Sequence, residues 1–147
     1  MYVILQEMKK LIVYTDGGAR GNPGPAGIGV VIADESGVTL HESQAYIGET
    51  TNNVAEYEAL IRALEDLKMF GERLRDMEVE VRMDSELVVR QMQGRYKVKE
   101  PSLKERFGRV AELKLSHAPN LVFVHVPREQ NRRADELVNE AIDSATT

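Results

Sequence analysis

Four acidic residues stand where a folded chain could bring carboxylates together. Asp16 and Asp84 each follow a β-rich run directly, and Glu56 and Asp135 each fall in the first turns of an expected helix. Like charges a few ångströms apart raise one another's pKa unless a cation shares them. Carboxylate oxygens without Cys or His ligands favour Mg²⁺ or Mn²⁺ over zinc. A pair of such ions is the apparatus of in-line phosphodiester cleavage, which needs no protein nucleophile.

Each acid taken alone has an ordinary structural explanation. Asp16 could close an Asx-turn and Asp84 could cap a helix. Glu56 could belong to a capping box, and Asp135 could face a helix dipole. No Ser/His/Asp or Cys/His arrangement competes with the acids, and the Gly-rich segment 17–29 lacks the ending of a P-loop. That segment is expected to form a tight turn near the acids.

The hydrophobic pattern predicts the elements that must position these acids. Three β-rich runs joined by short links predict an antiparallel meander over 10–15, 27–33 and 38–47. Apolar residues at helical spacing then predict a helix over 53–70 that Gly71 ends. The remaining expected elements are a strand over 77–83, a short helix over 85–93, a helix from Pro101, a strand over 121–126 and a last helix around 134–142.

This order predicts an α/β fold with a five-stranded mixed sheet, three antiparallel strands and then two parallel ones, and helices on both faces. If the helix over 53–70 is a right-handed crossover, the strand over 77–83 lies parallel beside the first strand. The carboxyl ends of these strands then meet at one edge of the sheet. Asp16 and Asp84 are therefore expected about one strand spacing apart, roughly 5 Å.

The composition suits one compact domain. A chain of 147 residues with 42% hydrophobic content predicts a single domain over 1–147, with residues 1–9 as a candidate N-terminal extension. The absence of cysteine excludes disulfides and thiol catalysis, and fits a reducing cytoplasm. The longest apolar runs are too short to cross a bilayer and no export signal is visible. We expect a cytoplasmic monomer without a membrane partner.

The charge distribution modifies what the net charge implies. A net charge of −5 argues by itself against nucleic-acid binding, because Lys and Arg supply phosphate contacts. Residues 34–80 carry twelve Asp/Glu against four Lys/Arg, whereas residues 90–114 carry eight Lys/Arg against three Glu. A basic surface can therefore exist on an acidic protein. The alternative is an ordinary solvated helix face.

Four ordered blocks over 10–141 resemble the type 1 ribonuclease H family. They are YTDGGARGNPGPAGIGVVI from Tyr14, TNNVAEYEALIRAL from Thr51, DSELVVRQMQG from Asp84 and VPREQNRRADELVNEA from Val126. The resemblance implies a ribonuclease H-like fold and an endonuclease that cuts the RNA strand of an RNA–DNA hybrid, leaving 5′-phosphate and 3′-hydroxyl ends. It implies two Mg²⁺ ions with substrate bound, with Mn²⁺ as a substitute. The implied catalytic and metal-binding acids are Asp16, Glu56, Asp84 and Asp135.

The resemblance also implies contacts with the hybrid. Asn22, Asn52 and Asn53 would read the RNA through its 2′-hydroxyls, because an amide side chain and a 2′-hydroxyl each offer a donor and an acceptor. Thr51 would help to hold a phosphate of the DNA strand. Asn131 matches a family asparagine near the substrate, although helix N-capping would explain it equally well.

Several positions depart from the family's pattern. Arg128 takes the place of a mobile histidine found in many members, and is assigned as a further catalytic residue. His125 lies in the alternating run LVFVHV and is expected to be structural. Glu86 stands where many relatives carry glutamine, which would alter the outer shell of the metal site. The segment from Gly94 replaces a longer basic protrusion, which predicts modest affinity for the hybrid. No separate hybrid-binding domain is expected before Lys10.

Two other functions fit the same resemblance. A non-catalytic hybrid-binding module would have little reason to keep all four acids, given their mutual repulsion. A nuclease of the same fold could act on another nucleic acid, such as double-stranded RNA. The three asparagines favour contact with RNA without deciding between an RNA–DNA hybrid and an RNA duplex.

Overall fold

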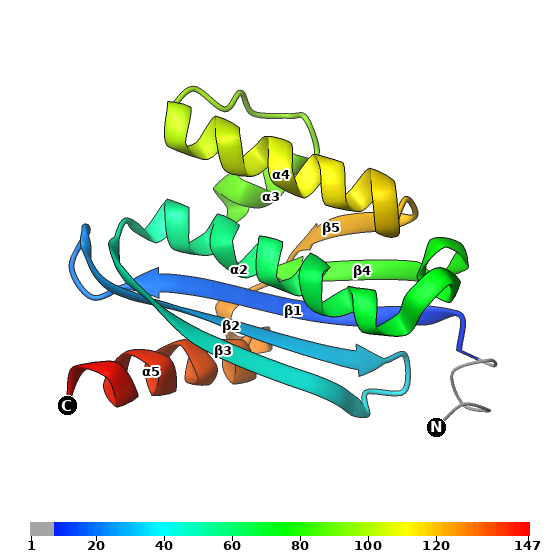
Figure 1. Cartoon of the computed structure of the whole chain (residues 1–147), viewed down its shortest axis with the longest axis horizontal. Helices are drawn as coiled ribbons and strands as arrows, with labels where there is room; N and C mark the ends of the chain where they lie inside the picture. The colour runs from blue at the N-terminus through cyan, green and yellow to red at the C-terminus, as the bar shows by residue number, and fades with distance from the viewer. Residues whose placement is uncertain (1–7) are drawn as a thin grey trace.

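The computed structural model describes residues 8–147, which form a mixed sheet with helices on both of its faces (Figure 1). The strands are β1 (Lys10–Ala19), β2 (Gly24–Asp34), β3 (Thr39–Thr50), β4 (Glu78–Met83) and β5 (Leu121–His125). The helices are α2 (Asn52–Leu67), α3 (Glu86–Met92), α4 (Pro101–His117) and α5 (Arg132–Thr146), with 3₁₀ segments over Lys68–Asp76 and Arg128–Gln130. Residues 1–7 of the predicted extension lie outside the described part.

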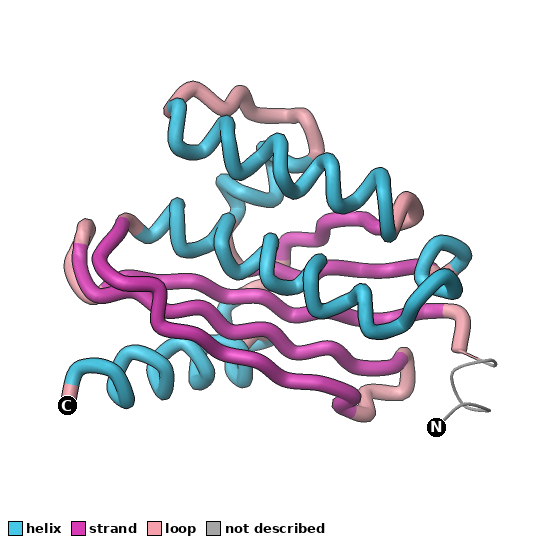
Figure 2. The backbone as a smooth tube through the Cα atoms, viewed as in Figure 1, coloured by secondary structure: helices cyan, strands magenta, loops and turns pink. Residues whose placement is uncertain are grey.

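The five strands are ordered β3-β2-β1-β4-β5. The first three pair antiparallel, and β4 pairs parallel with both β1 and β5. Figure 2 shows the sheet between α2, α3 and α4 on one side and α5 on the other. The predicted mixed sheet, with its antiparallel meander and parallel late strands, is confirmed.

The register between β1 and β4 brings two acids to one edge of the sheet. Tyr14 of β1 pairs with Arg82 of β4. Asp16 and Asp84 each follow two residues later, so both lie at the same edge of the sheet. The expected end of β1 at Thr15 is wrong, because β2 continues to pair with β1 as far as Ala19. Asp16 therefore lies inside β1, at a level where the neighbouring strand β4 has already ended.

The main core lies between the sheet and the helices α2 and α4. The expected alternation of β4 is confirmed, because Val79, Val81 and Met83 are all buried. Helix α2 begins where Thr51 Oγ1 accepts a hydrogen bond from the Val54 N–H at 3.3 Å. Its expected end is wrong by three residues: α2 stops at Leu67, and the chain tightens into 3₁₀ turns that change direction at Gly71 (φ 66°).

Glycines allow a helix to lie unusually close to the sheet on each face. A Cβ atom at Gly17 would lie 2.2 Å from the Ala55 carbonyl oxygen of α2. A Cβ atom at Gly29 would lie 2.3 Å from the Ala134 carbonyl oxygen of α5. The expectation that segment 17–29 is mainly a tight turn is therefore wrong: most of it is paired strand. Its glycines bring two acid-bearing helices against the sheet.

None of the helices in residues 8–147 combines the length and the apolar character needed to cross a lipid bilayer.

Candidate active site

The four predicted acids line one groove at the edge of the sheet, and three of them converge closely. One carboxylate oxygen from each of Asp16, Glu56 and Asp84 lies within 4.8 Å of the others. These acids come from β1, the first turns of α2 and the residue after β4. Asp135, from the first turn of α5, lines the same groove of about 420 Å³ but stands outside the three-acid cluster.

Burial and mutual repulsion make the ionised forms of these three acids energetically unfavourable. Burial raises the pKa of Asp16 to about 8, and the charges of Asp84 and Asp135 add to the rise. Burial, followed by the charge of Asp16, raises the pKa of Glu56 well above its usual value. Burial also raises the pKa of Asp84, although the Arg128 guanidinium opposes the shift. The acids therefore form a site that favours positive charge.

The donor set fits a hard divalent cation. Glu56 Oε1 accepts a hydrogen bond from the Gly17 N–H at 3.3 Å. The other oxygen, Glu56 Oε2, is buried without a hydrogen-bond partner among the described residues. A buried carboxylate oxygen normally has a partner, and a bound cation would supply it. Oxygen-only ligands are those that Mg²⁺ and Mn²⁺ prefer.

Two of the predicted substrate-binding asparagines already use their carbonyl oxygens inside the protein. Asn52 Oδ1 accepts from the Ala19 N–H at 2.8 Å, and Asn22 Oδ1 accepts from the Asn52 N–H at 3.0 Å. These bonds tie the turn after β1 to the start of α2. Each of these oxygens therefore has one of its two lone pairs engaged inside the protein, while the NH₂ group of each amide can still donate to a ligand. Asn53 lies next to them, half-buried, in the first turn of α2.

Arg128 lies at the mouth of the groove. Its side chain is 78% exposed, and its Nη2 lies 3.8 Å from Asp135 Oδ1. His125 lies at the exposed end of β5, with Nδ1 3.9 Å from Glu86 Oε2. Neither His125 nor Glu86 is among the residues that line the groove. Of Arg128, His125 and Glu86, only Arg128 therefore lies beside the acids.

Asn131 is buried rather than open to substrate. It is 1% exposed, and its Nδ2 donates to the Thr15 carbonyl oxygen at 2.8 Å. Asn131 stands at the expected N-cap position of α5, but its side chain makes no capping hydrogen bond to the helix. Asn131 instead links the start of α5 to the residue before Asp16. The geometry favours a positioning role over the predicted contact with the hybrid.

The basic region of residues 90–114 divides into two parts. On α4, Arg106 pairs with Glu58 at 2.7 Å and Arg109 pairs with Glu65 at 2.7 Å, so these arginines hold α4 against α2. The loop before α4 carries the exposed residues Arg95, Lys97 and Lys99. Tyr96 of this loop donates to Glu86 at 3.4 Å, which places the basic loop beside the helix that follows Asp84. The loop therefore presents an exposed basic surface beside α3, whereas Arg106 and Arg109 of α4 are engaged in ion pairs with α2.

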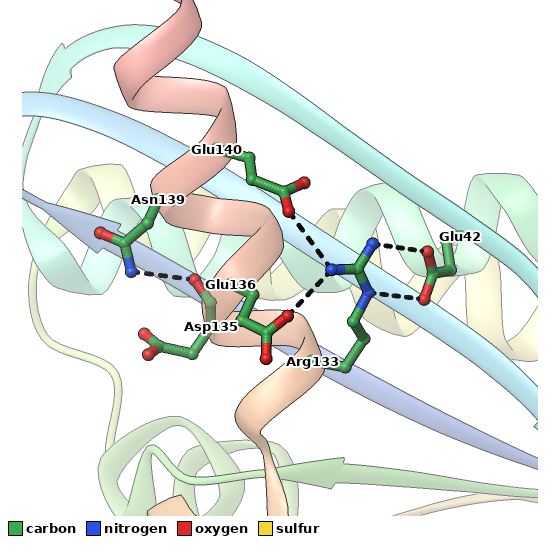
Figure 3. Close-up of polar contacts among 6 residues, drawn as sticks. All are labelled: Glu42, Arg133, Asp135, Glu136, Asn139 and Glu140. Carbon is green, nitrogen blue, oxygen red and sulfur yellow. Dashed lines mark hydrogen bonds and ion pairs between the residues drawn. The ribbon is translucent and has the colours of Figure 1, made fainter.

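An arginine on α5 fixes that helix to the edge strand β3. Figure 3 shows the Arg133 guanidinium between the Glu42 carboxylate and two glutamates of α5, with Asp135 on the opposite side of the helix. Arg133 donates to both oxygens of Glu42 at 2.8 and 2.9 Å, and to Glu136 at 3.0 Å. Hydrogen bonding from Arg133 lowers the pKa of Glu42. The ion pairs hold the turn that presents Asp135.

The sequence did not single out Arg20 and Asn139, which also line the groove. Arg20 lies in the turn after β1, and Asn139 lies one turn after Asp135 on α5, where its Nδ2 donates to the Asp135 carbonyl oxygen at 3.0 Å. The spacing of Asp135, Asn139 and Asp143 by four residues could have predicted that they share one face of α5.

The sheet order and the acids at its edge are those of a ribonuclease H-like domain. A family model described as reverse transcriptase-like matches residues 14–141. The crystal structure of LC11-RNase H1, isolated from compost by a metagenomic approach, was solved in complex with an RNA/DNA hybrid. The chain is 78% identical to it, with a TM-score of 0.91 over 93% of this chain and 99% of that one. The chain belongs to the type 1 ribonuclease H family.

Two curated relatives agree with this assignment. The ribonuclease H of Halorhodospira halophila is 37% identical over 145 residues, which cover 88% of this chain and 91% of the relative. The bifunctional protein Rv2228c of Mycobacterium tuberculosis is 47% identical over 138 residues, which cover 92% of this chain. The chain spans 36% of the length of that mycobacterial relative.

Proposed function

We propose that this chain is an endonuclease that hydrolyses the RNA strand of RNA–DNA hybrids and leaves 5′-phosphate and 3′-hydroxyl ends. The observation that carries the proposal is the convergence of Asp16, Glu56 and Asp84 within 4.8 Å, in a groove that Asp135 also lines. LC11-RNase H1, which shares 78% of its sequence with this chain, binds an RNA/DNA hybrid in its crystal structure.

The acids would hold Mg²⁺, as two ions when substrate is bound, with Mn²⁺ as a substitute. Ions bound there would activate a water molecule and stabilise the leaving oxygen of the scissile phosphodiester. The chain's own contribution is to hold four carboxylates at fixed positions from both faces of the sheet. Arg128 faces Asp135 at the mouth of the groove, where we assign it to turnover rather than to affinity.

The hybrid would lie across the groove between two polar surfaces. On the RNA side, the NH₂ groups of Asn22 and Asn52 would donate to 2′-hydroxyl oxygens, with Asn53 beside them. Thr51 would hold a phosphate of the DNA strand. The exposed loop over 95–99, beside α3, would supply positive charge to the hybrid. We further propose that residues 1–147 form one catalytic domain, with 1–9 as an N-terminal extension. A monomeric state and a cytoplasmic location stay predictions from the sequence.

A cleavage assay on three matched duplexes tests the proposal. The RNA–DNA hybrid, the RNA duplex and the DNA duplex of one sequence are each incubated with and without Mg²⁺. We expect metal-dependent cutting of the RNA strand of the hybrid alone. Asp84→Asn should abolish turnover while the fold and hybrid binding persist, because the amide keeps the shape of the side chain but removes a cation ligand.

The outcomes separate the three candidate functions. Cutting of the RNA duplex at a similar rate would favour a nuclease with another substrate. Hybrid binding without any cutting in Mg²⁺ or Mn²⁺ would favour a non-catalytic module. Full activity of the Asp84→Asn chain would refute the assignment of the acids.

A further inference from the structure

Arg20 is a cation in the groove that the proposed reaction does not yet use. It lies in the turn between β1 and β2 and lines the groove together with the four acids. Apart from Arg128, it is the only Lys or Arg among the groove-lining residues of the described chain. Its side chain is 44% exposed, so it is accessible from the groove.

Two residues of α5 hold the Arg20 guanidinium in place. Nη1 donates to Asp143 Oδ1 at 2.6 Å, and Nη2 donates to Asn139 Oδ1 at 3.0 Å and to the Asn139 carbonyl oxygen at 3.5 Å. A guanidinium has five N–H donors, so these three bonds leave others for a ligand. Because its orientation is set before a ligand arrives, less side-chain entropy is lost on binding than for a free arginine.

The position along α5 indicates which part of a nucleic acid would meet this arginine. Asn139 and Asp143 lie four and eight residues after Asp135, which corresponds to roughly 6 and 12 Å along the helix axis. The scissile phosphate must lie at the acids, so a cation displaced along the same groove meets a different phosphate of the same strand. An oriented guanidinium is well matched to a phosphate because it can form two parallel hydrogen bonds.

We propose that Arg20 contacts a phosphate of the RNA strand adjacent to the scissile one, and that Asn139 and Asp143 orient it for this contact. This inference rests on the proposed function. A positioned phosphate contact would set which bond of the strand lies over the acids. The turn that carries Arg20 also carries Asn22, so one short segment would contact both a phosphate and a 2′-hydroxyl.

The test uses the salt dependence of binding, because each lost phosphate contact changes the slope by a known amount. Affinity for a labelled RNA–DNA hybrid is measured in an Asp84→Asn background, with Mg²⁺, at several KCl concentrations. Arg20→Gln should reduce the slope of log K against log [KCl] by about 0.9. Its loss of affinity should then be about 3.5-fold larger at roughly 50 mM than at roughly 200 mM KCl.

Two matched variants separate phosphate binding from other effects. Arg62→Gln removes the same charge from an arginine that is 43% exposed and paired with Asp66 outside the groove, and its slope should not change. Asp143→Asn breaks the ion pair that orients Arg20 but keeps the cation, so it should weaken hybrid binding by less than Arg20→Gln does and should retain the slope. Equal losses of hybrid affinity in Arg20→Gln and Asp143→Asn would instead show that Arg20 only ties the turn to α5.

An unchanged slope in Arg20→Gln, with normal binding and cleavage by the unaltered chain, would overturn this inference alone. Failure of the unaltered chain to bind or cut the hybrid would overturn the proposed function, and this inference with it.

Discussion

Replacing Asp16 with asparagine should stabilise the metal-free protein, and the gain should depend on pH. Asp16 is 7% exposed, and burial beside Asp84 raises its pKa from 3.8 to about 8. The folded chain therefore retains a proton that the unfolded chain releases. Below the unfolded pKa both states are protonated and folding is not penalised, whereas the folded state loses stability as the pH rises from about 4 to about 8.

The size of the effect follows from the shift. Each pKa unit corresponds to about 1.4 kcal/mol, so a rise from 3.8 to about 8 destabilises the fold by roughly 4 kcal/mol at pH 7. Asparagine removes the charge but leaves a buried amide, whose missing hydrogen bonds cost about 1–3 kcal/mol. The variant should show no gain or a small loss of stability at about pH 4.5, and it should be more stable than the unaltered chain by roughly 2 to 4 kcal/mol at about pH 7.5.

Urea unfolding followed by circular dichroism, with EDTA present, measures this gain at both pH values. Asp76→Asn is the matched control: Asp76 is exposed and precedes β4, at the opposite end of that strand from Asp84, and its replacement removes the same charge. We expect a pH-dependent gain only for Asp16→Asn. A gain of the same size at both pH values, or none at either, would refute the view that an ionised acid at this position destabilises the fold.

Two further variants test single side chains at the groove. Asn52→Asp keeps the acceptor for the Ala19 N–H, but it removes the amide donor and adds a negative charge that repels phosphate. Hybrid affinity measured by fluorescence anisotropy should therefore fall about tenfold or more, while the unfolding temperature stays nearly constant. Unchanged affinity would show that the NH₂ group of Asn52 does not contact the hybrid. Arg128→Ala should lower the turnover number by about tenfold but weaken substrate binding less, because this exposed side chain faces Asp135. Steady-state kinetics with a separate binding measurement checks this, and an unchanged turnover number would exclude a catalytic role.

The sequence predicted the arrangement of the acids because local rules determine it. Alternation in 77–83 identified a buried strand, and the handedness of a crossover placed that strand parallel to the first one. Asp16 and Asp84 then had to meet at one edge. Helical spacing placed Glu56 and Asp135 on the sides of their helices that face the sheet.

Other features depend on contacts between segments that no local pattern connects. Asn52 Oδ1 accepts a hydrogen bond from the N–H of Ala19, 33 residues away, so this structural use of the amide oxygen could not be predicted. The ion pair between Glu42 and Arg133 spans 91 residues. The role of Gly29 depends on how closely α5 approaches the sheet, and glycine in a short Gly-rich segment more commonly indicates a turn.

The acids are distributed over nearly the whole chain, from residue 16 in the first strand to residue 135 in the last helix. No fragment that lacks either end of the fold contains all of them. A ribosome that makes this protein would therefore complete the proposed active site only after the last helix has emerged and packed on the sheet. A nascent chain would lack one of the four acids until then.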